Sequence, residues 1–203
     1  MGIVKSEGKE SAKRARDGRD RLLDGAGRLL AERGYAGMEL RDVAARGEAP
    51  RGSIYHHFPG GKAQLATEAA ELDGVRVRTG IERSLLERGL KETLVMFGEL
   101  FRRRSQADPA LIGCPVAAAA LARPEDPALA AAATAAFESW ENAIAAALER
   151  EGVDAERAAT FAAMTISTVE GALIRARAAG SHAPLDSAIA GLEQALEALL
   201  ATR

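Results

Sequence analysis

The spacing of apolar residues constrains the fold of this chain more than any other feature. Runs in which Val, Ile, Thr or Tyr alternate with polar residues, the pattern of a strand, are absent, and the helix formers Ala, Leu, Glu and Arg dominate. Apolar residues instead recur at intervals of three and four, the period of a helix with one buried face. Near the N-terminus these residues are Leu22, Leu23, Ala26, Leu29 and Leu30. The sequence therefore predicts an all-α protein.

Glycine and proline divide the helical sequence into segments. Gly34 is predicted to end the first helix as a left-handed cap. Pro50 is predicted to open the third helix, because the N–H that proline lacks would be unpaired in a first turn anyway. Residues 1–16 are polar and are predicted to be a disordered basic tail. The predicted helices span residues 17–33, 39–46, 50–57, 62–88, 91–104, 109–122, 126–150, 154–178 and 184–201.

Charge is distributed unevenly along the 203 residues, although the net charge is only -2. Residues 1–62 hold 13 Lys and Arg against 9 Asp and Glu, while the remainder holds 14 against 20. A basic small part joined to an acidic large part is expected when only the small part contacts phosphates. The basic tail alone would produce the same excess, through Lys5, Lys9, Lys13, Arg14 and Arg16.

Two of the predicted helices are short and are joined by a three-residue turn, Gly47-Glu48-Ala49. This is the geometry of a helix-turn-helix, in which the second helix enters the major groove of DNA. That second helix needs a buried side and a polar side. Ile54 and Phe58 are four residues apart and supply the buried side, while the residues predicted to point outward are Arg51, Ser53, Tyr55 and His56.

The helix-turn-helix belongs to a longer set of residue types at fixed spacing, within residues 18–66. The set comprises Gly34-Tyr35, Leu40-Arg41-Asp42-Val43-Ala44, Gly52-Ser53-Ile54-Tyr55-His56-His57-Phe58, Lys62 and Leu65. In it the chain resembles the N-terminal domain of the TetR family. Three segments resemble the LmrA/YxaF-like branch more closely: Ala49-Pro50-Arg51-Gly52-Ser53, Pro59-Gly60-Gly61-Lys62 and Gly113-Cys114-Pro115-Val116.

The chain departs from the family pattern at two places. The family usually has Thr near Met38, where its hydroxyl caps the second helix, and here Met38-Glu39 offers no such cap. Pro50 replaces a Ser of the usual turn and removes a hydroxyl that could bind phosphate. The resemblance implies a TetR-like fold with a three-helix DNA-binding domain at residues 17–61 and a helical ligand-binding and dimerisation domain at residues 62–203.

The predicted DNA contacts lie in this N-terminal part. Lys62 begins a long helix, where backbone N–H groups and the ammonium can share one phosphate, and arginines can reach phosphate or a guanine edge. The predicted contact residues are Arg41, Pro50, Arg51, Gly52, Ser53, Tyr55, His56 and Lys62. Arg14, Arg16 and Arg19 are further candidates for contacts with the phosphates or the minor groove of DNA. Packing of Tyr55 and solvated charges at Arg41, Arg51 and Lys62 are the alternative interpretations.

No metal site is predicted in the chain. His56 and His57 are adjacent, so on a helix they point in different directions, and no Asp, Glu or Cys stands at ligand spacing from them. Cys114 could suggest a nucleophile or a redox sensor, but no basic partner or second cysteine accompanies it. We therefore expect neither a metal nor another cofactor.

The larger predicted domain carries apolar stripes and most of the aromatic residues. Stripes on the last two helices are predicted to form a four-helix dimer interface, with Thr165, Thr168, Val169, Ala172, Ile189, Leu192 and Leu196. The predicted ligand pocket comprises Met96, Phe97, Phe101, Cys114, Phe137, Trp140, Phe161 and Met164. In both cases the alternative is that the residues only pack the core of their own subunit.

The resemblance implies a sequence-specific regulator that binds a palindromic operator on double-stranded DNA as a homodimer. It further implies a repressor that a small hydrophobic or aromatic ligand releases, although an activator or a ligand-independent regulator would share the same residues. An all-helical enzyme is a third alternative, but the sequence has no HExxH, glycine-rich phosphate loop or serine elbow. With one cysteine and no run of eighteen apolar residues, the chain is expected in the cytoplasm, with no membrane contact.

Overall fold

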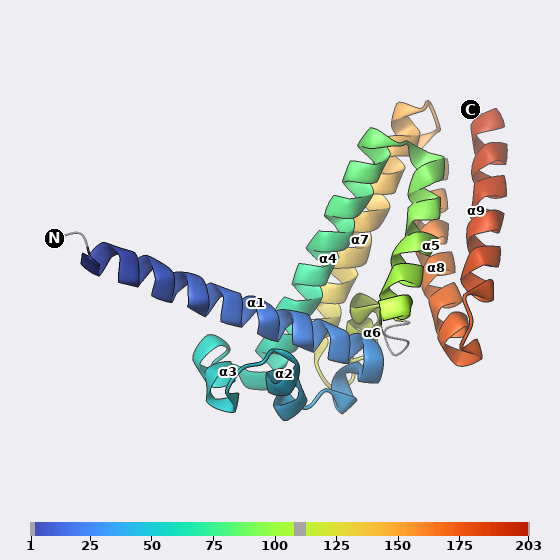
Figure 1. Cartoon of the computed structure of the whole chain (residues 1–203). Coiled ribbons are helices and arrows are strands. Elements are labelled where there is room, and N and C mark those ends of the chain that lie inside the picture. The colour runs from blue at the N-terminus through green and yellow to red at the C-terminus, as the bar shows by residue number, and fades with distance from the viewer. Residues whose placement is uncertain (1–2, 108–112, 203) are drawn as a thin grey trace.

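The secondary structure in the described part of the chain is entirely helical, as the sequence predicted (Figure 1). A computed structural model describes the backbone of residues 3–107 and 113–202, and the side chains of residues 17–50, 52–103 and 113–202. The helices are α1 (Ile3–Gly37), α2 (Leu40–Arg46), α3 (Arg51–His57), α4 (Gly61–Glu87), α5 (Leu90–Ala107), α6 (Pro115–Ala120), α7 (Pro127–Arg150), α8 (Ala155–Ala179) and α9 (Ala183–Ala201).

Helix α1 differs from its prediction at both ends. It begins at Ile3 and extends away from the body of the molecule, where the sequence predicted a disordered tail over residues 1–16 (Figure 1). Those residues include many strong helix formers and no proline, so a helix nucleated in the packed part can continue through them. At the other end Gly34 has φ 70° and ψ 178°, which kinks the helix before a last short turn to Gly37.

Helix α6 is shorter than the span of 109–122 predicted for it, of which residues 109–112 lie outside the described part. Its first residue is Pro115, and Cys114 is the N-cap. Proline is suited to the first turn because it has no N–H to leave unpaired. The Sγ of Cys114 accepts a hydrogen bond from the N–H of Ala117 at 3.5 Å.

The N-terminal helices pack around one apolar centre. Leu22 of α1, Ile54 of α3 and Leu65 of α4 are all buried there. As expected from the missing Thr, α2 starts at an N-cap, Glu39, that makes no side-chain capping bond. Met38 is fully buried just before it, so packing fixes the start of α2.

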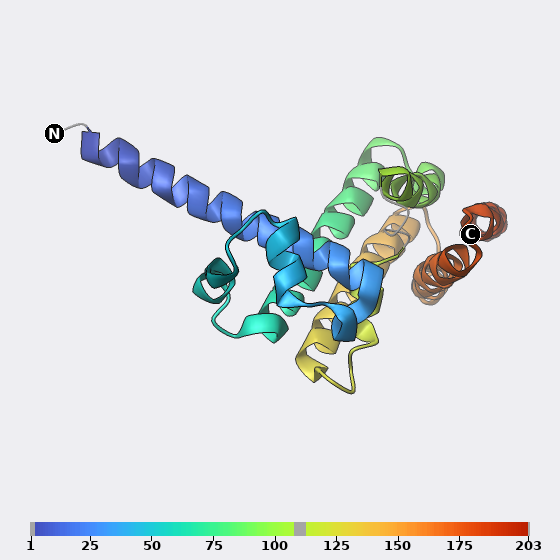
Figure 2. The ribbon, with the colours of Figure 1, turned by 60° about the horizontal axis from the view of Figure 1, so that its bottom comes forward.

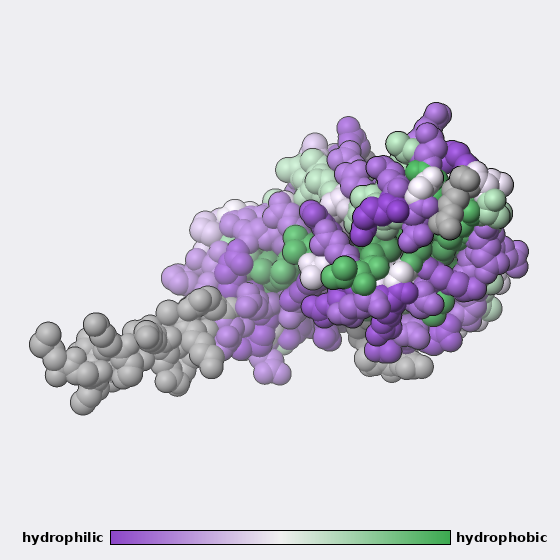
Figure 3. Space-filling model, turned by 90° about the horizontal axis from the view of Figure 1, so that it is seen from above, coloured by the Kyte–Doolittle hydropathy of each residue, from purple (hydrophilic) through white to green (hydrophobic). Residues whose placement is uncertain are grey.

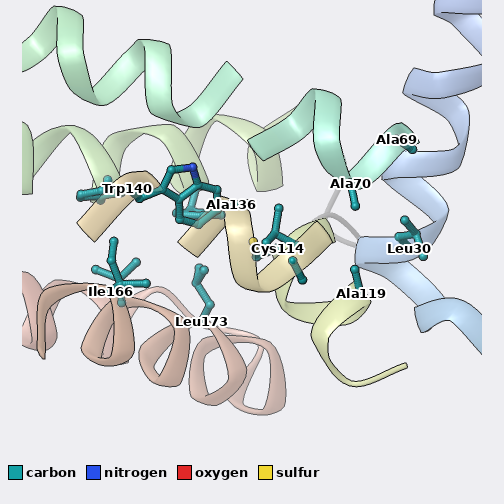
Figure 4. Packing of buried hydrophobic residues seen from close by; sticks show 14 of the residues in the cluster. Leu30, Ala69, Ala70, Cys114, Ala119, Ala136, Trp140, Ile166 and Leu173 are labelled. Carbon is teal, nitrogen blue, oxygen red and sulfur yellow. The ribbon is translucent and has the colours of Figure 1, made fainter. Parts of the chain in front are cut away.

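Helices α4 and α7 lie side by side and form the middle of the larger part (Figure 1). They approach closely at Gly74 and Ala136: a Cβ at Gly74 would lie 2.8 Å from that of Ala136. Next to this contact, the indole N–H of Trp140 donates to the carbonyl of Gly74 at 2.8 Å. The buried cluster continues from Leu30 of α1 to Leu173 of α8, so one core joins the N-terminal helices to the rest (Figure 4).

Hydrophilic side chains cover much of the face seen in Figure 3, with apolar residues gathered between them. Within the part of the chain that the structure describes, no helix is long and apolar enough to span a membrane.

A double-mutant cycle tests the approach of α4 and α7. Gly74→Ala places a methyl group against Ala136, and overpacking of this kind typically costs about 1–3 kcal/mol. Ala136→Gly removes the opposing methyl group at the ordinary helix cost of about 1 kcal/mol. We expect the double variant to be more stable than the sum of the single effects by about 1–2 kcal/mol in urea unfolding. Additive effects would show that the two helices do not touch here.

Candidate DNA interface and ligand cavity

Helix α3 is anchored on one side and exposed on the other. Ile54 is 1% exposed and Phe58 is 0% exposed, whereas Tyr55 is 62% exposed and His56 is also exposed. The N–H of Phe58 donates to the carbonyl of Ile54 at 2.7 Å, which closes the helix. Figures 1 and 2 show α3 at the edge of the molecule, away from α5 to α9. The buried side is as predicted for Ile54 and Phe58, and the outward side is as predicted for Tyr55 and His56.

The other residues predicted to contact DNA are accessible, with one outside the described side chains. Pro50, Gly52 and Arg41 are exposed, and Ser53 is half-buried. The hydroxyl of Ser53 donates to the carbonyl of Pro50 at 2.6 Å, so its proton is used within the first turn of α3. The side chain of Arg51 lies outside the described residues.

Lys62 does not extend freely into solvent. Its ammonium donates to the carbonyl of Ala36 at 3.3 Å and lies 4.7 Å from the centre of the Tyr35 ring, a cation–π distance. The hydroxyl of Tyr35 donates in turn to Asp126 at 3.2 Å. Burial and the charge of Asp126 raise the pKa of Tyr35, which keeps this hydroxyl protonated. The N-terminal part and the cap of α7 are thereby connected.

His57 is the last residue of α3, and its ring lies next to Gly18 of α1. Burial, the neighbouring charge of His56 and the guanidinium of Arg19 lower its pKa from 6.5. Arg19 lies over the ring of Phe58 at 5.0 Å from its centre and forms an ion pair with Glu68 of α4. A neutral His57 is therefore part of the contact that holds α1, α3 and α4 together.

A small cavity lies where α4, α5, α7 and α8 meet, next to the start of α6. Its open space is about 10 Å³, room for roughly one water molecule. Four of the predicted pocket residues line it: Phe97, Phe101, Cys114 and Trp140. Figure 4 shows Trp140, Cys114 and Ile166 around this part of the core. A ligand of drug size can enter only if these helices move apart.

Burial, followed by the charge of Glu170, raises the pKa of the Cys114 thiol well above its usual value. The thiol is therefore protonated at neutral pH and lacks the thiolate character of a nucleophile. Its structural role is to cap α6 and to line the cavity.

The other four predicted pocket residues do not line this cavity. Met96 lines a surface groove between α4 and α5, Phe137 packs edge-to-face on Trp140 with ring centres 5.3 Å apart, and Phe161 is buried elsewhere in the core. Met164 is 41% exposed on the surface of α8, so its assignment to a pocket is wrong. The sequence analysis missed the remaining lining residues, which are Asp73, Val77, Leu100, Ile166, Val169 and Glu170.

The structure also corrects the predicted dimer interface. Six of its seven residues are buried within the single chain: Thr165, Val169, Ala172, Ile189, Leu192 and Leu196. These side chains pack in the core of their own subunit and are not available to a second copy. Only Thr168 is partly exposed. The sequence showed apolar stripes correctly, but burial within the subunit explains them.

Among the described residues, no group of three or more His, Cys, Asp or Glu side chains is placed to hold a metal ion.

Two family models match the chain. Residues 22–69 match the family described as bacterial regulatory proteins, tetR family, and residues 91–190 match the C-terminal domain of the LmrA/YxaF-like transcriptional regulators. The first match covers the helix-turn-helix, and the second covers most of the cavity and of the last two helices.

Three individual proteins show how far the similarity extends. An uncharacterized HTH-type transcriptional regulator of Mycobacterium tuberculosis is 34% identical over 175 residues, 83% of this chain and 88% of that protein. The HTH-type transcriptional repressor AcnR of Corynebacterium efficiens is 39% identical over 77 residues, 36% of this chain and 40% of its own. The crystal structure of a TetR transcriptional regulator from Chloroflexus aurantiacus superposes with a TM-score of 0.73 at 28% identity, covering 90% and 95% of the two chains.

The lowered pKa of His57 gives a pH dependence whose sign is fixed. Because the folded value lies below the unfolded one, the stabilisation is present above about pH 6.5 and is lost as the pH falls through the folded pKa. We expect the free energy of unfolding to fall less between about pH 6.5 and 5 in His57→Gln than in the unmodified chain. His56→Gln should reduce this fall only in part, because the charge of His56 is one of the causes of the lowered pKa of His57. Equal slopes in all three proteins would contradict a half-buried His57 with a lowered pKa.

Proposed function

The chain belongs to the TetR family of bacterial transcriptional regulators, and from this premise we propose that it is a homodimeric repressor which a small hydrophobic ligand releases from a palindromic operator. As a member of this family it is a DNA-binding regulator and not an enzyme. We assign residues 17–61 to DNA binding and residues 62–203 to ligand binding and dimerisation. Its place of action is then the cytoplasm, where the operator lies.

The exposed side of α3 is the observation that carries the proposal. Tyr55 and His56 project from a helix that Ile54 and Phe58 fix in place, so polar groups can enter a major groove without rearrangement. We propose that the operator is contacted by Arg41, Pro50, Arg51, Gly52, Ser53, Tyr55, His56 and Lys62. Repression is supported by the name of AcnR, a repressor that is similar to this chain over 77 residues.

We propose that a ligand releases the operator by opening the cavity between α4, α5, α7 and α8. With about 10 Å³ of open space, the cavity cannot admit a ligand while the helices keep their present packing. Four helices would have to separate, and α4, which forms one wall with Asp73 and Val77, also begins beside α3. We therefore assign the closed form of the cavity to the DNA-bound state. The binding energy of the ligand would favour an open form in which the helices have moved apart.

A homodimer is supported by an exposed face on the last two helices, which lie side by side at the edge of the molecule (Figures 1 and 2). At intervals of three and four, α8 exposes only uncharged residues: Thr160, Met164, Ser167, Gly171, Ile174 and Ala178. Helix α9 does the same with Ser187, Gly191, Gln194, Ala198 and Ala201. Such stripes fit two helices from each subunit in a four-helix interface.

A charge placed on the α8 stripe tests the dimer. Gly171→Glu would bury an unpaired carboxylate in the proposed interface, at a cost of roughly 3 kcal/mol or more, which is over a hundredfold in the dimer dissociation constant. Ala159→Glu adds the same charge at an exposed position outside the stripe and should leave the dimer intact. Sedimentation equilibrium measures both. A dimer that tolerates Gly171→Glu would place the interface elsewhere.

The function itself is tested with DNA selected by the protein from a random duplex library, and with a reporter in a strain that lacks the gene. We expect a palindromic site, reporter output that rises on deletion, and release of the duplex by planar aromatic compounds in gel-shift titration. Output that falls on deletion would make the protein an activator. Binding without sequence preference would exclude a specific regulator.

Tyr55→Phe refines that experiment, because it removes only the phenolic hydroxyl. Loss of one hydrogen bond to a charged phosphate should weaken binding to the selected duplex about tenfold or more. Leu86→Ala alters an even more exposed apolar residue at the far end of α4 and should have no effect. An unchanged affinity in Tyr55→Phe would remove this residue from the interface.

A further inference from the structure

Arg177, near the end of α8, binds the end of α1 across 146 residues of sequence. Its Nη1 donates to the carbonyl of Ala31 at 2.6 Å, and its Nη2 donates to the carbonyl of Glu32. Both carbonyls lie just before the kink at Gly34, where a helix has acceptors left over at its end. A guanidinium can hold two such acceptors at once because its donors form a rigid fork.

The backbone at Gly113 closes the other side of this contact. A Cβ on Gly113 would lie 2.9 Å from the carbonyl oxygen of Ala31 and 3.5 Å from Nη1 of Arg177. The first distance is too short for a real side chain, so this approach requires glycine. The end of α1 is thus held between α8 and the segment that starts α6.

The end of α1 is in turn tied to α2. Arg33 forms an ion pair with Asp42 at 2.6 Å, and Glu32 pairs with Arg46. Helix α2 packs on α3, the recognition helix. A shift of α1 at Ala31 and Glu32 is therefore passed to the surface that meets DNA.

We propose that Arg177 is a positioning residue that fixes the DNA-binding helices relative to α8, and so sets the distance between the two recognition helices of the dimer. This rests on the proposed function, because α8 carries the stripe assigned to the dimer interface. Arg177 lies between Ile174 and Ala178 of that stripe, and its hydrogen bonds connect α8 to the DNA-binding domain. It contacts no DNA itself.

Helix α8 and the segment that starts α6, which hold the end of α1, also line the cavity. Cys114 follows Gly113 directly, and Glu170 precedes Arg177 by two turns of α8. Opening the cavity must displace at least one of these walls. The contact at Arg177 thus lies where such a displacement would reach α1.

The test varies the spacing of half-sites in the duplex that the unmodified protein selects. Moving one half-site by one base pair changes the separation by about 3.4 Å and turns it by roughly a tenth of a helical turn. The unmodified dimer should prefer its selected spacing over a spacing altered by two base pairs by about a hundredfold. In Arg177→Ala we expect this preference to fall below about tenfold, because the hydrogen bonds from Arg177 to α1 no longer fix the separation of the recognition helices.

Two further variants separate positioning from simple loss of stability. Gly113→Ala keeps every charge but pushes Ala31 away from Arg177, so it should relax the spacing preference in the same way. Arg83→Ala removes an exposed arginine at the far end of α4 and should leave the preference unchanged. A variant that was merely less stable, as judged by thermal melting, would lose affinity for every spacing alike.

An unchanged spacing profile in both Arg177→Ala and Gly113→Ala would overturn the positioning role while the proposed function stood. If the unmodified protein selected no pair of half-sites, the proposed dimeric repressor would fail, and the positioning role with it.

Discussion

The close approach of α4 to α7 is the constraint on which the other features depend. Gly74 and Ala136 leave no room for larger groups, and the indole of Trp140 satisfies the carbonyl of Gly74 beside them. Helix α4 starts in the DNA-binding part and ends at the opposite end of the molecule, so fixing it against α7 gives both parts a common frame. The positions of the cavity walls and of α3 both depend on this contact between α4 and α7.

Local pattern was enough to predict most of the helices and the orientation of α3. Apolar spacing placed Ile54 and Phe58 inside. The start of α6 was predicted at residue 109, whereas the helix begins at Pro115 with Cys114 as its N-cap. Residues 3–16 are the first part of α1 and not a disordered tail, since polar composition alone does not distinguish a helix from disorder. Aromatic content found Phe97, Phe101 and Trp140, which line the cavity.

Features that depend on distant segments could not be read from local pattern. Val169 and Leu192 form apolar stripes, yet the same stripe would suit an interface or a core, and only the three-dimensional packing decides between them. The exposed face of α8 differs from an ordinary surface only in lacking charged residues at positions such as Ser167 and Gly171. In the sequence this is a weaker signal than the apolar stripe on the same helix. Nothing in the sequence relates Arg177 to Ala31.

The closed cavity has a consequence for sensitivity. A ligand that must first await a rarely populated open form binds with an apparent dissociation constant raised by the inverse of that population. In the proposed ligand response, the concentration at which the cell responds would be set by how firmly the helices around Trp140 and Val169 pack, as well as by the contacts of the ligand. Evolution could shift this threshold by altering residues that the ligand never touches.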